Sequence, residues 1–448
     1  MAMRLLSKTY WNGSQIRFRT DPGEVNCEAV RLNADGADIR GFYWTPKHNP
    51  RPRAAVIASH PRVDFSHHHA FPALLKAGYA CLGGNLRSVN NDMDCVHEKL
   101  VLDIARHMIW LKEERGVERV LLLGNSGGGS LFSFYQSQAA AAPGDRIATT
   151  PGGRPTGLPS ADLPQGDAIV YMAAHTGQGL IINETIDPSV LDESRPMLTD
   201  SSLDMYDPAN GFRMPPEWSR YDAGFVLRYR AAQIERVRRL DAVAREMIAD
   251  SARAEALHAD PGFAALAPAL QRDILRREVF EPVMVIHRTM ANLHYADPTL
   301  DPSPRAYGSL LSERPDLMNF QHRGFARVQT PHAWLSTWSG LSSNANTHLT
   351  APKVTLPALV IHAGKDLDVF PNTHSRKIFE ALASEDKQYW DFPNALHYFE
   401  PEHGETGSGT LDPLMERLVP WIEERVPLGR RGGGGDEGNG PCFQRRRP

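Results

Sequence analysis

The sequence is poor in cysteine. Its 448 residues include only Cys27, Cys81, Cys95 and Cys442. These four are scattered, and no two have the CxxC spacing of a zinc or redox motif, so we expect neither a disulfide framework nor a metal site. A protein with so few cysteines fits a reducing, cytoplasmic compartment.

Long apolar runs and an excess of basic charge are also missing. No stretch reaches the 18 or more apolar residues of a membrane span, and the N-terminal residues lack the apolar core of a secretory signal. Lysine and arginine number 49 against 53 aspartates and glutamates, for a net charge of -4. We therefore expect no membrane or nucleic-acid partner, and a small molecule as the substrate.

Short apolar runs alternate with helical patterns through residues 1–175. A strand hairpin is predicted around the turn Asp35-Gly36. Further strands are predicted at 53–60, 80–85, 117–124 and 167–175, and helices at 71–79, 97–116 and 130–142. Strand, helix, strand, helix predicts an α/β protein with a mostly parallel sheet and helices on both faces.

The alternation stops between residues 176 and 355 and then resumes. The interrupting block contains a long charged helical pattern at 217–257, so we interpret it as an inserted, mainly helical cap domain. Strands at 356–364 and 387–392 and helices at 372–384 and 410–425 complete the sheet, with the last helix kinked or shortened at Pro420. The predicted domains are the core in two parts, 1–175 and 356–428, the cap at 176–355, and a disordered Gly- and Arg-rich tail at 429–448.

One serine lies among glycines directly after a predicted strand. The segment is Gly124-Asn125-Ser126-Gly127-Gly128. A G-x-S-x-G pattern between a strand and a helix is the nucleophile elbow, a tight turn that exposes the serine oxygen and requires small neighbours. The N–H of Gly127 is then the first donor to the oxyanion that forms on the substrate.

Two other uses of a glycine-rich turn fit less well. A phosphate-binding loop would need a lysine before the serine or threonine, and a dinucleotide-binding fingerprint would need G-x-G-x-x-G. Neither pattern is present around Ser126. The nucleophile is therefore the favoured interpretation.

Partners for a serine nucleophile follow the insertion in the expected order, acid and then histidine. Asp366 ends a predicted strand and His397 follows the next, while Asp368 is an alternative acid. The histidine would act as general base, and the carboxylate would orient its ring. Because Pro61 has no N–H, we assign the second oxyanion donor to the backbone of Arg62.

These segments resemble the α/β-hydrolase superfamily. The resemblance rests on the elbow, on the "LVIHAGKDLDVFP" and "ALHYFEP" segments, and on "GYACLGGNLRS", within about residues 25–175 and 356–427. It implies the α/β-hydrolase fold, a Ser126, Asp366, His397 triad, a cap after the sixth strand, and no metal or organic cofactor. The chain departs from the family in its His60-Pro61 pair, where many relatives have His-Gly, and in its unusually large cap.

Five further residues are predicted to bind substrate: His60, Asn125, His175, Trp334 and Trp338. The two tryptophans favour a bulky, aromatic group, although packing within the cap explains them equally well. The neighbouring His332 belongs to the same segment. The histidine run 67–69 could bind a metal, but adjacent histidines rarely point at one ion, so we interpret it as a loop at the rim of the site.

We therefore predict a serine hydrolase that forms an acyl-enzyme with a carboxylic ester of medium or bulky size, with amides and lactones as related substrates. A thioesterase or a C–C bond hydrolase would use the same triad, since the elbow does not distinguish the leaving group. A non-catalytic binding protein on the same fold is the third alternative. The large cap could also join two copies of the chain into a homo-oligomer.

Overall fold

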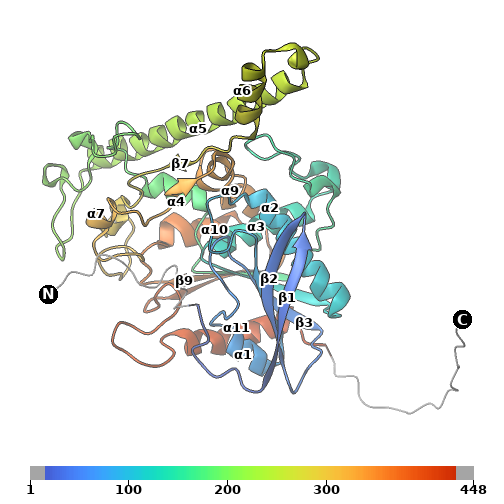
Figure 1. Cartoon of the computed structure of the whole chain (residues 1–448). Helices are drawn as coiled ribbons and strands as arrows, with labels where there is room; N and C mark the ends of the chain where they lie inside the picture. The colour runs from blue at the N-terminus through green and yellow to red at the C-terminus, as the bar shows by residue number, and fades with distance from the viewer. Residues whose placement is uncertain (1–15, 430–448) are drawn as a thin grey trace, which may run out of the picture.

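A computed structural model describes residues 16–429 of the chain (Figure 1). The expectations about residues 1–15, Cys442 and all of the C-terminal tail beyond Gly429 lie outside the described residues. Cys27, Cys81 and Cys95 are free thiols, the first exposed and the other two buried.

The core is one eight-stranded sheet. Its strands are β1 (Val25–Ala34), β2 (Ala37–Pro46), β3 (Ala54–Ala58), β4 (Ala80–Asn85), β5 (Arg119–Asn125), β6 (Ala168–Met172), β9 (Ala358–Ala363) and β10 (Lys387–Phe392). They lie in the order β1-β2-β4-β3-β5-β6-β9-β10. β2 is antiparallel to β1 and β4, and all other pairs are parallel, which confirms the predicted mostly parallel sheet.

The hairpin at the edge of the sheet forms where the sequence predicts it. Ala34 pairs with Ala37, and the two turn residues Asp35 and Gly36 have φ of 50° and 79°. Two positive φ values in a two-residue loop match the right-handed twist of the strands, and Asp-Gly adopts them at little cost.

Helices cover both faces of the sheet because successive strand side chains point to opposite sides. On one face Ile57 and Leu122 pack with α2 (His97–Ile109) and α3 (Gly127–Ala140), and α10 (Arg376–Ala381) joins the same cluster. On the other face Val56 and Leu121 pack with α1 (Phe71–Ala77) and α11 (Leu411–Arg425). Figure 1 shows α1 and α11 together below the sheet.

Pro420 does not shorten the last helix, so a shortened helix is the wrong one of the two predicted outcomes, and a kink at Pro420 stays a prediction. α11 continues past it to Arg425. Pro420 is exposed, while Leu418 and Trp421 on either side are buried. Water can therefore satisfy the carbonyl that loses its intrahelical partner, and burial of the apolar face keeps the helix together.

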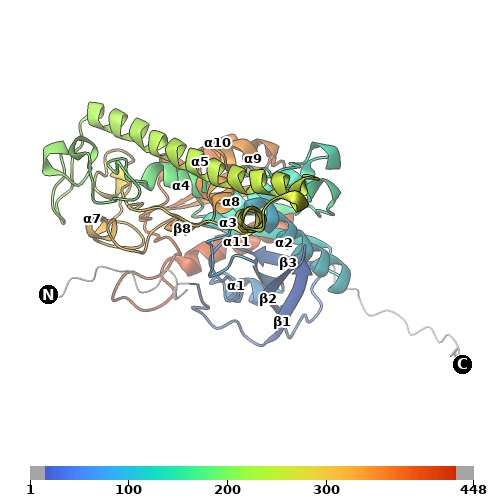
Figure 2. The same ribbon diagram turned by 45° about the horizontal axis from the view of Figure 1, so that its top comes forward.

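A long insertion separates two neighbouring strands, because β6 pairs directly with β9. Its helices are α4 (Gln178–Thr185), α5 (Ala223–Ala259), α6 (Pro268–Val279), α7 (Pro315–Met318), α8 (Pro331–Ala333) and α9 (Thr347–Thr350), and its strands are β7 (Met284–Val285) and β8 (Val328–Gln329). α5 crosses the molecule on the side away from α1 and α11 (Figures 1 and 2).

The longest helix begins later than the sequence pattern suggests. The predicted start is residue 217, whereas α5 starts at Ala223 because the Asp222 side chain accepts the N–H groups of Gly224 (2.8 Å) and Phe225 (3.3 Å). This is an N-cap, which fixes the first turn. Within residues 16–429, none of the helices combines the length and the apolar character needed to cross a membrane.

Candidate active site

Ser126 occupies a strained turn between β5 and α3. Its φ is 54° and its ψ is -125°, a conformation that residues with a side chain rarely adopt. The turn is held by neighbouring strands, since the N–H of Ser126 donates to the carbonyl of Met172 at 3.0 Å. Strain of this kind is kept where the surrounding structure enforces it, typically at functional sites.

The glycines around Ser126 are required by close backbone contacts. A Cβ on Gly128 would lie 2.4 Å from the carbonyl oxygen of Ser59, and a Cβ on Gly124 would lie 2.6 Å from the Cα of Gly129. Both distances are below any real Cβ contact. The backbone of α3 can therefore approach β3 and β5 closely only because these positions lack side chains.

His397 and Asp366 form a hydrogen-bonded pair beyond the ends of β10 and β9. The Nδ1 of His397 lies 2.5 Å from Oδ2 of Asp366. Asp366 Oδ1 accepts the N–H groups of Asp368 and Val369 at 2.9 and 3.0 Å. The ring Nε2 of His397 has no hydrogen-bond partner among the described residues and is left for another group.

Each member of this pair shifts the pKa of the other in the direction that favours the charged form. Burial alone would lower the pKa of His397, but the charge of Asp366 and its hydrogen bond raise that pKa above its ordinary value. Burial would raise the pKa of Asp366, and the attraction of His397 brings it below its ordinary value instead. The arrangement favours an ionised carboxylate that stabilises a protonated imidazole.

Ser126 and His397 face one small pocket of about 30 Å³. The residues that line it are His60, Arg62, Ser126, His175, Gln178, Ile181, Leu310, Phe325, Trp338, Asp368, Val369 and His397. Of the predicted site residues, the structure thus brings together the serine, the histidine, His60, Arg62, His175 and Trp338. Asp366 is not among the lining residues but is hydrogen-bonded to His397, which is.

Two predicted substrate-binding residues are not among those lining the pocket. Asn125 is fully buried; its Nδ2 donates to the Met172 carbonyl, and its Oδ1 lies 3.3 Å from His68 Nε2. Trp334 is fully buried in the inserted segment, where its Nε1 donates to Asp241 at 2.8 Å. Both side chains are used in packing and internal hydrogen bonds.

The backbone N–H of Arg62 is engaged elsewhere, contrary to its predicted role as an oxyanion donor. It donates to Nδ1 of His60 at 3.0 Å. The Arg62 side chain forms an ion pair with Asp92 at 3.0 Å and lies 4.9 Å from the ring centre of Trp338. The guanidinium, rather than the backbone, is the part of this residue that can influence the pocket.

The alternative acid, Asp368, lines the pocket itself but makes no hydrogen bond to His397, which is bonded to Asp366. Burial raises the pKa of Asp368 to about 7, against the lowering effect of the Tyr295 hydroxyl. Asp366 is therefore the carboxylate that is hydrogen-bonded to His397, and Asp368 is a polar group in the wall of the pocket.

Sequence reasoning did not assign four of the lining residues. They are Ile181, Leu310, Phe325 and Val369. Three of them come from the insertion, where no periodic pattern marks which side chains face the core. Gln178, which also lines the pocket, is indicated by its place three residues beyond His175, where a role in the pocket and a role as a hinge are equally good interpretations of the sequence.

The histidine run takes part in packing. His67 lies among the rings of Phe18, Phe42 and Trp44, and the rings of His68 and His69 stack 4.2 Å apart. Within the described part of the chain, no group of three or more metal-ligating side chains comes together.

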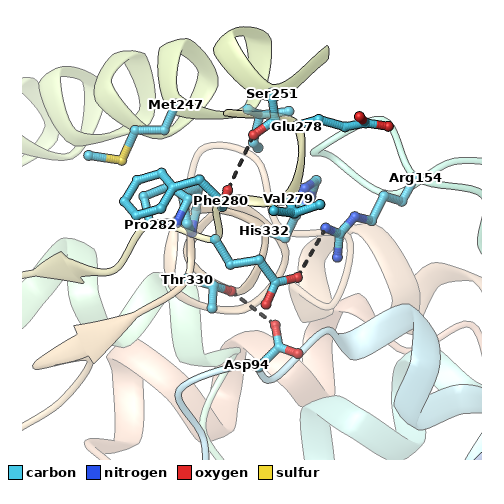
Figure 3. A pocket seen from close by; sticks show the side chains of 13 residues that line it. Asp94, Arg154, Met247, Ser251, Glu278, Val279, Phe280, Pro282, Thr330 and His332 are labelled. Carbon is cyan, nitrogen blue, oxygen red and sulfur yellow. Dashed lines mark hydrogen bonds and ion pairs between the residues drawn. The ribbon is translucent and has the colours of Figure 1, made fainter. Parts of the chain in front are cut away.

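A second cavity of about 140 Å³ lies between the insertion and the core (Figure 3). Met247 and Ser251 of α5 and Phe280 face it from above, and His332 also lines it. Thr330 donates to Asp94 at 3.0 Å at its lower edge. His332 thus belongs to this cavity, whereas Trp338 from the same segment lines the Ser126 pocket.

The order of the site residues along the sheet decides the fold. The strained serine follows β5 and begins α3, the acid follows β9, and the histidine follows β10. A nucleophile elbow on a mostly parallel sheet, with acid and histidine in that chain order, defines one fold. This chain has the α/β-hydrolase fold.

Comparisons with known proteins give distant structural similarities. No protein-family model and no curated protein sequence matches the chain. It is similar in structure to Est1E from Butyrivibrio proteoclasticus, at 12% identity and a TM-score of 0.42, over 89% of this chain and 98% of Est1E. It is also similar to the acylaminoacyl peptidase of Pyrococcus horikoshii, at 11% identity and a TM-score of 0.41, over 92% of this chain and 43% of the peptidase. A third similar structure is the monoacylglycerol lipase of Paleococcus ferrophilus, at 13% identity and a TM-score of 0.36, over 89% of this chain and 99% of the lipase.

Proposed function

We propose that the protein is a serine hydrolase that cleaves a carboxylic ester through an acyl-enzyme. Ser126 is the nucleophile, His397 the general base, and Asp366 the carboxylate that orients the base. The observation that carries this proposal is that a serine in a strained turn shares one pocket with a histidine whose Nδ1 is bonded to a buried carboxylate. This is the arrangement that activates a serine hydroxyl.

The reaction follows from the free ring nitrogen. Nε2 of His397 takes the proton of Ser126 as Oγ attacks the ester carbon, and the carbonyl electrons move onto the oxygen. When the tetrahedral intermediate collapses, the same proton goes to the leaving alcohol. Water then repeats the sequence on the acyl-enzyme, so that the acid is released and Ser126 is regenerated.

The inserted segment is proposed to act as a cap over this chemistry. Ile181, Leu310, Phe325 and Trp338 form the apolar part of the pocket, and all four belong to residues 176–355. A volume of about 30 Å³ is far below the roughly 300–1,000 Å³ of typical ligand pockets. A medium or bulky acyl group therefore requires the cap to move away from Ser126 before substrate enters.

The triad does not determine which bond is cleaved. The shape of the pocket and the leaving group of the substrate determine it. Amides, lactones, thioesters and C–C bonds next to a carbonyl are the alternatives that the same residues could attack. A binding protein without catalysis is the remaining alternative. Binding alone would make no use of the hydrogen-bonded pair formed by Asp366 and His397.

Labelling with a fluorophosphonate tests the proposal directly. We expect one label per chain at Ser126, lost in Ser126→Ala, whose ester hydrolysis should fall by roughly 10⁴-fold or more. Ser130→Ala is the matched control, because Ser130 lies in the first turns of the same helix and its hydroxyl donates to the Gly127 carbonyl. A panel of esters, thioesters and amides then ranks the leaving groups. A folded wild type that takes no label would overturn the proposal.

A further inference from the structure

The site lacks the backbone donor that should complete its oxyanion hole. Pro61 has no N–H, and the N–H of Arg62 is committed to the His60 ring. The next N–H along the loop, that of Val63, donates to the same Nδ1 atom at 3.0 Å. The loop after β3 therefore offers the substrate no free N–H between residues 61 and 63.

These two hydrogen bonds fix the tautomer of His60. An imidazole nitrogen that accepts from backbone N–H groups carries no proton, so the proton of the neutral ring is on Nε2. Burial lowers the pKa of His60 well below its ordinary value, and the nearby Arg62 charge adds to the effect. The ring is thus a neutral group with one N–H donor, at Nε2.

His175 is fixed in the same way. Its Nδ1 accepts the N–H of Gly177 at 3.1 Å, which leaves the proton on Nε2. Burial lowers its pKa well below the ordinary value, and His374, His397 and Arg62 add to the effect. Because His175 follows β6 and His60 follows β3, the two rings approach Ser126 from opposite sides of β5.

Both Nε2 atoms converge on the residue after the nucleophile. A Cβ placed on Gly127 would lie 2.7 Å from Nε2 of Gln178, 3.0 Å from Nε2 of His60 and 3.2 Å from Nε2 of His175. The two histidine donors and the Gln178 amide therefore flank one small space beside the start of α3, next to the N–H of Gly127. Both side chains also line the Ser126 pocket.

We infer that the oxyanion hole of this site is built from the Nε2–H groups of His60 and His175 together with the backbone N–H of Gly127. The inference rests on the proposed serine hydrolase function and replaces the backbone donor predicted at Arg62. When Oγ of Ser126 bonds to the carbonyl carbon, the displaced electron pair collects on oxygen, and the three N–H groups donate hydrogen bonds to it. No proton leaves either ring, and the serine proton goes to His397.

Asparagine and glutamine variants separate this role from a structural one. An asparagine amide reaches about as far as Nδ1 and can still accept the loop N–H groups, but it has no donor at the Nε2 position. Glutamine reaches about as far as Nε2 and restores a donor there. We therefore expect His60→Asn and His175→Asn each to lower kcat by about 10²–10³-fold with little change in KM, and the glutamine variants to recover part of the loss.

A purely structural role predicts the reverse order, because only asparagine keeps the acceptor for the loop. His107→Asn is the matched control: His107 is a fully buried histidine on α2 whose Nε2 faces the Asn85 carbonyl, away from this pocket. Its kcat should match the wild type once the protein is folded, as judged by circular dichroism.

A thionoester substrate supplies a second measurement. The ratio of the rates on ester and thionoester does not change with the fraction of a variant that is folded. Sulfur accepts hydrogen bonds poorly, so an oxyanion hole makes the wild type prefer the oxygen ester. We expect the ester-to-thionoester ratio of kcat/KM to fall at least tenfold in His60→Asn and His175→Asn. An unchanged ratio, or a kcat within threefold of wild type in both variants, would overturn the inference.

The fluorophosphonate label distinguishes the two possible failures. If the wild type is labelled at Ser126 and hydrolyses esters while the variants keep their rates, only the side-chain oxyanion hole is wrong. If the wild type is neither labelled nor active, the proposed function fails and the inference fails with it.

Discussion

His397 is the residue whose protonation should set the pH dependence of the reaction. A base must be neutral to accept the serine proton, so activity falls as the pH drops below the pKa of His397. The Asp366 charge raises that pKa above its ordinary value of 6.5, against burial. We therefore expect kcat/KM to rise with pH through a midpoint above 6.5, measured with a neutral ester.

Substitution of the carboxylate tests the cause of that midpoint. Asp366→Asn should shift the midpoint downward and lower kcat by roughly 10⁴-fold, since the ring loses both its charge partner and its orientation. Glu400 and Asp368 also raise the pKa of His397, but less than Asp366 does. A wild-type midpoint below pH 6 would contradict the electrostatics described for the pair.

Residue types and chain order were enough to identify Ser126, Asp366 and His397 as candidates, because the elbow is a local pattern. The directions in which the side chains point could not be predicted in this way. Whether Arg62 offers its N–H depends on where the His60 ring turns, and nothing in the sequence around Pro61 specifies that rotation. The same limit applies to Trp334, which the structure bonds to Asp241 in a distant helix.

At the scale of elements, the turn from β5 to α3 depends on backbone contact. Gly128→Ala would place a Cβ 2.4 Å from the Ser59 carbonyl, so β3 and α3 must separate. We expect a stability loss of about 1–3 kcal/mol or more, measured by denaturant unfolding, together with loss of Ser126 labelling.

Gly144→Ala is the control for that substitution. Gly144 is exposed, and a Cβ there meets nothing within 4 Å. Its stability should stay within about 0.5 kcal/mol of the wild type. Equal losses of stability in Gly144→Ala and Gly128→Ala would show that any loss of a glycine has this effect, whether or not the position contacts β3.

The strands and core helices were predictable because their signals are local. Buried strands such as β3 are short apolar runs, and α2 has apolar residues at helical spacing. The start of α5 and the passage of α11 through Pro420 were not, since they depend on one cap side chain and on which face of a helix meets water.

For the whole molecule, the wall that the insertion adds to the pocket should control substrate size. Leu310 is half-buried and lines the pocket, so Leu310→Ala enlarges it at modest cost to stability. We expect the ratio of kcat/KM for a longer acyl ester over a shorter one to rise about tenfold or more. Leu341→Ala, at an exposed leucine of the same insertion, should leave the ratio unchanged. If both variants give the wild-type ratio, the insertion does not select the acyl group.

The direct pairing of β6 with β9 also has a consequence for synthesis on the ribosome. Residues 173–357 are translated between the two strands, which takes roughly 10–40 s at about 5–20 residues per second. Throughout that time β6, whose five residues are all buried in the finished sheet, presents an unpaired apolar edge. The nascent chain is therefore most prone to aggregate in this interval, and a chaperone that binds it then would protect the one strand whose partner has not yet been made.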